Sequence, residues 1–168
     1  MFDINEDIVY GGYSVCRIIG TEKNDLNGNM IDYYVLRPAF DPGSKIFVPM
    51  NNEKLTRKMH RLISETEVYE LIRIIPDLQI VWIENESERR EIYREALLKR
   101  DRREIINIIK TLRSHKQEQL EKKRRLHIYD EKILKEAEKT LFEEFAYILN
   151  MDPKGVSDFI DEQLKMIS

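Results

Sequence analysis

The pattern of apolar and polar positions changes character about a third of the way along the chain. Up to residue 62, short runs rich in Val, Ile and Tyr are separated by Gly, Pro and Asn, which is typical of β-strands. Beyond that point apolar residues recur every three or four positions, as in amphipathic helices. The pattern predicts an α+β chain with a β-rich domain over 1–62 and an all-α domain over 63–168.

The first domain is expected to form a small closed sheet. Strands are predicted over 7–10, 13–22, 30–37, 44–49 and 53–62. Asn27-Gly28 predicts a type I′ hairpin, because both central residues of that turn need positive φ. Alternation puts Ile46 and Val48 on one face and Phe47 on the other, so Phe47 is expected to point outward. An SH3-like or Tudor-like barrel would remove the exposed edges of so small a sheet.

The second domain carries helix start and stop signals. Ser64 followed by Glu67 has capping-box spacing, and Pro76 is expected to end that helix. Asp101 followed by Glu104 is a second signal of the same kind. Further helices are expected from Glu86, from near Asp130 and after Asp152-Pro153.

Composition predicts a protein of the cytoplasm. The single cysteine, Cys16, lies in an apolar run and is expected to be a buried small hydrophobe in a reducing compartment. No apolar run approaches the roughly 20 residues of a membrane span, and the first residues lack the basic start of a signal peptide.

Charge is segregated along the chain. The net charge is −3, yet residues 83–125 carry fourteen Lys and Arg against nine Asp and Glu. Residues 130–168 carry ten acids against five bases. This asymmetry indicates that the middle of the chain faces a polyanion, although a solvated helical face would give the same counts.

No residues of the chain form a recognisable catalytic pattern. His60, His115 and His127 are scattered, and the chain has no HExxH, no CxxC and no Gly-rich phosphate loop. Most carboxylates have Lys or Arg three or four positions away, as on solvated helix faces. We therefore expect no enzyme activity, no metal, no cofactor and no small-molecule substrate.

Trp82 is the only tryptophan and lies in a connection between predicted helices. Arg89 and Arg90 follow it, and an aromatic side chain beside basic groups is typical of nucleic-acid surfaces, where apolar wedges enter unstacked steps. The alternative is an interdomain core tryptophan packed by Ile80 and Ile83.

The opening of the chain, FDINEDIVYGGYSVCRI from Phe2 to Ile18, resembles the CarD/CdnL family of bacterial transcription regulators. The resemblance covers about residues 2–149 and continues through Gly28, Tyr33 to Leu36, Val48-Pro49, Trp82, Asp101 and Leu126 to Ala137. The chain departs from the family pattern at several positions. Glu6 and Gly11 stand where glycine and proline are usual, Phe47 where arginine can occur, and Lys99-Arg100-Asp101 where Ser-Gly-Asp is frequent.

The resemblance implies a Tudor-like domain that binds the β subunit of RNA polymerase and a helical domain that contacts promoter DNA. It implies that the tryptophan wedges at the upstream edge of the −10 region and stabilises the open complex. By position, the polymerase-binding residues would be Lys23, Asn24, Lys45 and Phe47. The DNA-binding residues would be Trp82 as the wedge and Arg89, Arg90 and Lys132 as phosphate contacts.

A protein adaptor is the remaining alternative. Its barrel would bind polymerase and its helices a second protein, with Trp82 buried and no salt-dependent DNA binding by the basic segment. Neither alternative involves a membrane.

Overall fold

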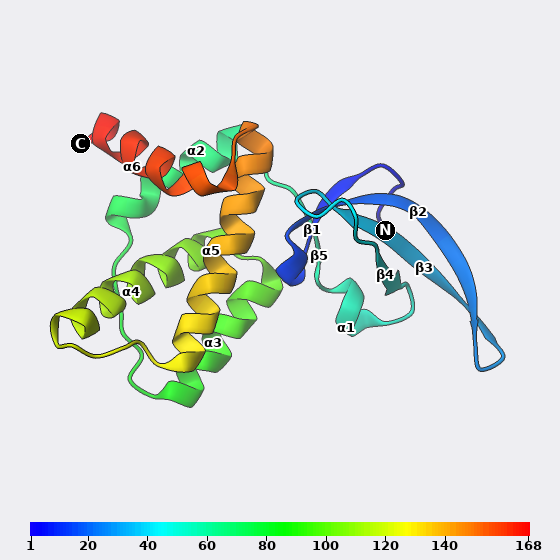
Figure 1. Cartoon of the computed structure of the whole chain (residues 1–168), viewed down its shortest axis with the longest axis horizontal. Helices are drawn as coiled ribbons and strands as arrows, with labels where there is room; N and C mark the ends of the chain where they lie inside the picture. The colour runs from blue at the N-terminus through cyan, green and yellow to red at the C-terminus, as the bar shows by residue number, and fades with distance from the viewer. The chain divides into compact units, whose positions relative to one another are not determined.

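The computed structural model describes residues 1–168, and the chain divides into two compact units, Met1–Leu62 and Ile63–Ser168. The first unit contains β1 (Asp7–Tyr10), η1 (Gly11–Tyr13), β2 (Val15–Leu26), β3 (Asn29–Pro38), β4 (Ile46–Pro49), α1 (Glu53–Thr56) and β5 (Met59–Arg61). The second contains α2 (Glu65–Ile74), η2 (Ile75–Asp77), α3 (Glu86–Lys99), α4 (Arg102–Glu121), α5 (Ile128–Leu149), η3 (Pro153–Gly155) and α6 (Val156–Ile167) (Figure 1). The predicted α+β class is confirmed.

The five strands form one antiparallel sheet in the order β4-β3-β2-β1-β5. Its core consists of fully buried side chains that include Ile8, Cys16, Ile18, Leu36 and Val48. The closed barrel is not confirmed, because β4 and β5 each pair on one side only and the sheet is open. The burial expected for Cys16 is confirmed.

The β2–β3 hairpin is longer than the sequence pattern predicted and extends beyond the other strands (Figure 1). Its turn is of the predicted kind, with φ of 54° at Asn27 and 85° at Gly28. Strand β2 continues to Leu26 because its last residues pair with β3 while both of their faces stay exposed. A strand with no buried face has no apolar alternation, so the pattern ended at residue 22.

The prediction of one strand over 53–62 is wrong in its first half. Asn52 begins a short helix there, because its side-chain oxygen accepts a hydrogen bond from the Leu55 backbone N–H at 3.3 Å. The strand that follows, β5, has only three residues.

The second unit follows its helix signals. Ser64 Oγ accepts a hydrogen bond from the Glu67 backbone N–H at 3.1 Å, and Asp101 Oδ1 accepts one from the Glu104 N–H at 3.2 Å. The apolar stripe of α5 lies in the core, with Phe145 fully buried. No helix combines the length and the apolar character that crossing a membrane requires.

Candidate interaction surfaces

The β4 edge presents both a free strand edge and an exposed aromatic side chain. Val48 is fully buried and Ile46 packs on the core, whereas Phe47 between them is 46% exposed. The outward orientation expected of Phe47 is therefore confirmed. Since β4 pairs only with β3, its other edge can accept a strand of a partner, with Phe47 as an apolar anchor beside it.

The strand register separates two predicted neighbours of Phe47. Asn24 pairs with Ile31, four residues from the Val35 that pairs with Phe47, so alternation puts Asn24 and Phe47 on one face. Lys23 pairs with Asp32, three residues from Val35, and therefore points to the opposite face. Lys45 is exposed and directly precedes β4. Asn24, Lys45 and Phe47 can thus serve one partner, and Lys23 lies apart from them.

Trp82 lies in the connection between η2 and α3 and is partly buried on the helical core. The His115 ring of α4 stacks on the indole, with 3.7 Å between centroids and 16° between planes. The Arg89 guanidinium lies over the same indole, 4.4 Å from its centroid. The sequence suggested either an exposed wedge or a tryptophan in an apolar core. The structure shows a third arrangement, in which a partly buried indole contacts an imidazole and a guanidinium.

Arg89 is a buried member of an ion pair. Its Nε and Nη2 donate to the two oxygens of Asp130 at 3.0 and 2.8 Å, and its Nη1 donates to the Ile83 carbonyl at 2.8 Å. The hydrogen bond to Asp130 raises the pKa of Arg89 above its ordinary value, despite the opposing effect of burial. With its donors directed inward, Arg89 does not favour a direct phosphate contact and instead holds Trp82 in place.

Arg90 and Lys132 meet at a second aromatic side chain, Tyr129 of α5. The Arg90 guanidinium lies 3.5 Å from the Tyr129 ring centroid and the Lys132 ammonium 5.9 Å from it. The His127 ring stacks on Tyr129 with 5.7 Å between centroids. Sequence analysis missed Tyr129, although its spacing of three residues from Lys132 on a helix is a local signal.

Some of the basic side chains in residues 83–125 form ion pairs within the protein. Arg89, Arg100 and Arg102 form ion pairs with buried carboxylates. By contrast, the run from Lys122 to Arg125 between α4 and α5 is exposed, and no side chain in it makes a hydrogen bond or an ion pair. The charge available to a polyanion is therefore concentrated beside Tyr129 in the sequence.

A buried charge cluster joins the end of α3 to α5. Glu144 has no exposed surface and accepts hydrogen bonds from Arg100 at 2.7 Å and from Arg102 at 2.8 Å. Arg100 also donates to the Thr140 hydroxyl at 2.9 Å and adopts a left-handed conformation with φ of 55°. Burial raises the pKa of Glu144, but the two guanidinium groups outweigh it, and the pKa lies below its ordinary value.

No three His, Cys, Asp or Glu side chains lie together as a metal site would require. In a comparison with family models, residues 2–63 match the CarD-like/TRCF RID domain. None of the curated proteins compared with the chain matches it.

Proposed function

Because residues 2–63 match the family model of the CarD-like/TRCF RID domain, we propose that the protein regulates bacterial transcription through two contacts. The first unit binds RNA polymerase at its β subunit, and the helical unit contacts promoter DNA near the upstream edge of the −10 region. The family is one of RNA polymerase-interacting domains, and its match over 2–63 is the observation that carries the proposal. The protein acts in the cytoplasm, at the nucleoid, through polymerase.

The polymerase contact uses the open edge of the sheet. A partner strand there extends the sheet and makes it more like a barrel. A strand of the β subunit pairs with the free edge of β4, and Phe47 supplies an apolar anchor beside it. Lys45 and Asn24 contribute polar contacts on the same face, while Lys23 would reach only a partner that also wraps the β2–β3 hairpin.

The DNA contact combines an aromatic wedge with phosphate contacts. Trp82 is the wedge, and Arg89 and His115 restrict it to one orientation, which lowers the entropy lost when it inserts. Lys132 contacts phosphate from its place over the Tyr129 ring, and Arg90 does so by exchanging its exposed Glu86 partner, 2.8 Å away, for phosphate. The exposed run from Lys122 to Arg125 adds attraction that depends on salt.

Weak DNA affinity is sufficient for this mechanism. Once the first unit is docked on polymerase, the helical unit meets DNA at a high effective concentration, because both units are one chain. About 1.4 kcal/mol of preferential binding to the open complex shifts its population ratio tenfold. No helix reads bases in this mechanism, so promoters are distinguished by how easily they melt.

The test is the lifetime of the open complex formed by purified bacterial RNA polymerase with and without the protein. We expect the wild type to change the lifetime, and Trp82→Ala and Phe47→Glu each to abolish the change. Phe40→Glu is a matched control, because Phe40 is 40% exposed yet lies outside β4. Loss of the effect with Phe40→Glu but not with Phe47→Glu would contradict the assigned edge.

A second measurement isolates the DNA contact. Lys132→Ala should lower the slope of log affinity against log salt by about one, as loss of one phosphate contact does. Lys165→Ala, an exposed lysine of α6, should leave the slope unchanged. An unaltered slope with Lys132→Ala would remove this residue from the DNA surface.

The adaptor function is the second candidate, and the partial burial of Trp82 favours it. If the protein binds polymerase yet leaves the open-complex lifetime and DNA affinity unaltered, the helical unit recruits a protein instead of DNA.

A further inference from the structure

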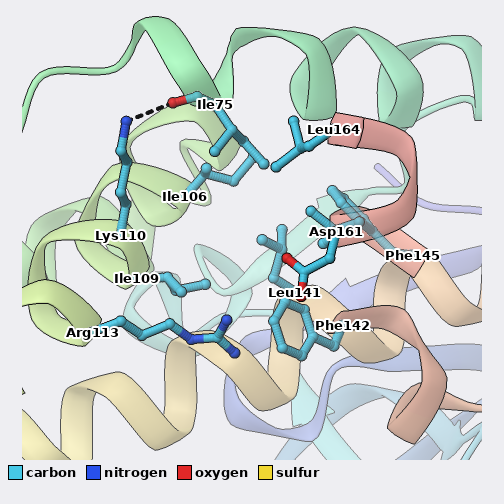
Figure 2. A pocket seen from close by; sticks show the side chains of 11 residues that line it. Ile75, Ile106, Ile109, Lys110, Arg113, Leu141, Phe142, Phe145, Asp161 and Leu164 are labelled. Atoms are coloured by element: carbon cyan, nitrogen blue, oxygen red, sulfur yellow. Dashed lines mark hydrogen bonds between the residues drawn. The ribbon is translucent and has the colours of Figure 1, made fainter. Parts of the chain in front are cut away.

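A pocket of about 200 Å³ opens among α4, α5 and α6 of the helical unit (Figure 2). Most of its lining is apolar, with side chains from Ile106, Ile109, Leu141, Phe142 and Leu164. The pocket is partly open to solvent, so the protein leaves these apolar side chains incompletely covered. Ligand pockets are typically concave and mostly apolar, with a few polar groups that fix the orientation of the ligand.

The two cations at the pocket are already engaged by the protein. Lys110 Nζ donates to the carbonyls of Ile75 and Leu78, both at 2.7 Å. Arg113 Nε donates to Glu138 Oε1 at 2.6 Å, which forms an ion pair. A ligand anion would therefore compete with partners that these cations already have.

Asp161 of α6 is the charged residue of the lining that has no hydrogen bond or ion pair. Figure 2 shows its carboxylate directed into the pocket above Phe142. Because Asp161 is exposed, the pocket meets solvent at this point, and a ligand can keep its polar end there. A carboxylate in this position accepts hydrogen bonds and favours positive charge.

We propose that this pocket binds a small amine with an apolar body, whose ammonium group pairs with Asp161. An apolar cavity of roughly 150 Å³ holds benzene, with six non-hydrogen atoms, so about 200 Å³ holds a body of roughly eight. A phenylethyl group has this size and leaves the amine nitrogen at the mouth. The site is independent of the polymerase and DNA contacts proposed above, and none of its lining residues belongs to them.

The test is titration of the full chain with 2-phenylethylamine, ethylbenzene and 3-phenylpropionate, followed by methyl NMR. The methyl groups of Ile106 and Ile109 should shift saturably with the amine, while those of Ile8 and Ile18 in the first unit stay unmoved. The amine should bind more tightly than ethylbenzene, and the carboxylate most weakly. Absence of saturable shifts at Ile106 and Ile109 with any of the three would overturn the proposal.

Two sets of variants test the ligand pose. Asp161→Asn should weaken amine binding about two- to fivefold, as expected of an exposed ion pair, and leave ethylbenzene unaffected. Leu164→Trp should fill the pocket and abolish binding, whereas Met166→Trp, 79% exposed on the same helix and outside the lining, should not. Tightest binding by the carboxylate, or equal amine affinity in Asp161→Asn, would refute the assigned chemistry even if Leu164→Trp fails to fold.

Discussion

Arg100, at the end of α3, has a left-handed backbone conformation and a buried, ion-paired side chain. Substitutions there can separate the contribution of the backbone to stability from that of the side chain. Arg100→Ala removes the guanidinium and leaves Glu144, which has no exposed surface, with Arg102 as its remaining cationic partner. Removing one member of a buried ion pair costs about 3–5 kcal/mol. The loss should be toward the lower end, because Arg102 still neutralises Glu144.

Arg100→Gly removes the same contacts but relieves the backbone. The left-handed conformation costs an L-residue about 1–2 kcal/mol, and the greater freedom of glycine in the unfolded chain cancels about 0.4–1 kcal/mol of that relief. The glycine variant should therefore be more stable than the alanine variant by about 1 kcal/mol. At Arg94, exposed within α3, the order should be reversed by about 1 kcal/mol, because alanine is the better helix former.

Urea unfolding followed by Trp82 fluorescence measures all four variants, since the only tryptophan lies in the same unit. Loss of less than 1 kcal/mol in Arg100→Ala would show that the buried pair contributes little. If the alanine variant is more stable than the glycine variant at position 100 as well as at position 94, the left-handed backbone of Arg100 does not cost the stability assigned to it.

Three further predictions concern other parts of the chain. Because the pKa of Glu144 is lowered in the folded protein, its charge stabilises the fold at pH values above 4.5, and this stabilisation is lost as pH falls through the folded pKa. In a series of urea unfolding midpoints at different pH, Glu144→Gln should therefore flatten the fall of the midpoint below pH 4.5. Asp130→Asn should lower the free energy of unfolding by about 3 kcal/mol, because it leaves Arg89 buried without its ion-pair partner. It should also shift the fluorescence emission of Trp82 as the guanidinium moves, and an unchanged spectrum would contradict the contact between Arg89 and the indole. Gly28→Ala should destabilise the first unit by about 1 kcal/mol in thermal unfolding, because φ there is 85°; no change would contradict the turn geometry.

Local signals in the sequence predicted local features. The alternation around Phe47 gave its outward orientation, and the caps at Ser64 and Asp101 gave the starts of two helices, because each depends on residues within four positions. The same kind of signal at Asn52 was missed, since a strand pattern was read across its four-residue helix.

The roles of buried charges could not be predicted in this way. Arg89 and Asp130 are 41 residues apart, and Arg100 and Glu144 are 44 apart. On a sequence, each of these arginines looks like any other charged helix residue, and only the packing of α3 against α5 pairs it with a carboxylate. This is why the sequence did not predict that Arg89 pairs with Asp130 and lies over the Trp82 indole.

The cluster around Glu144 also restricts how this chain can diverge. An arginine at position 100 tolerates its backbone conformation because a carboxylate at 144 holds its side chain, and that carboxylate is tolerated in the core because the arginine is present. Starting from glycine at position 100 and an uncharged residue at position 144, either replacement alone would be harmful. Positions 100 and 144 should therefore change together among relatives, with Gly paired to an uncharged residue and Arg to an acid.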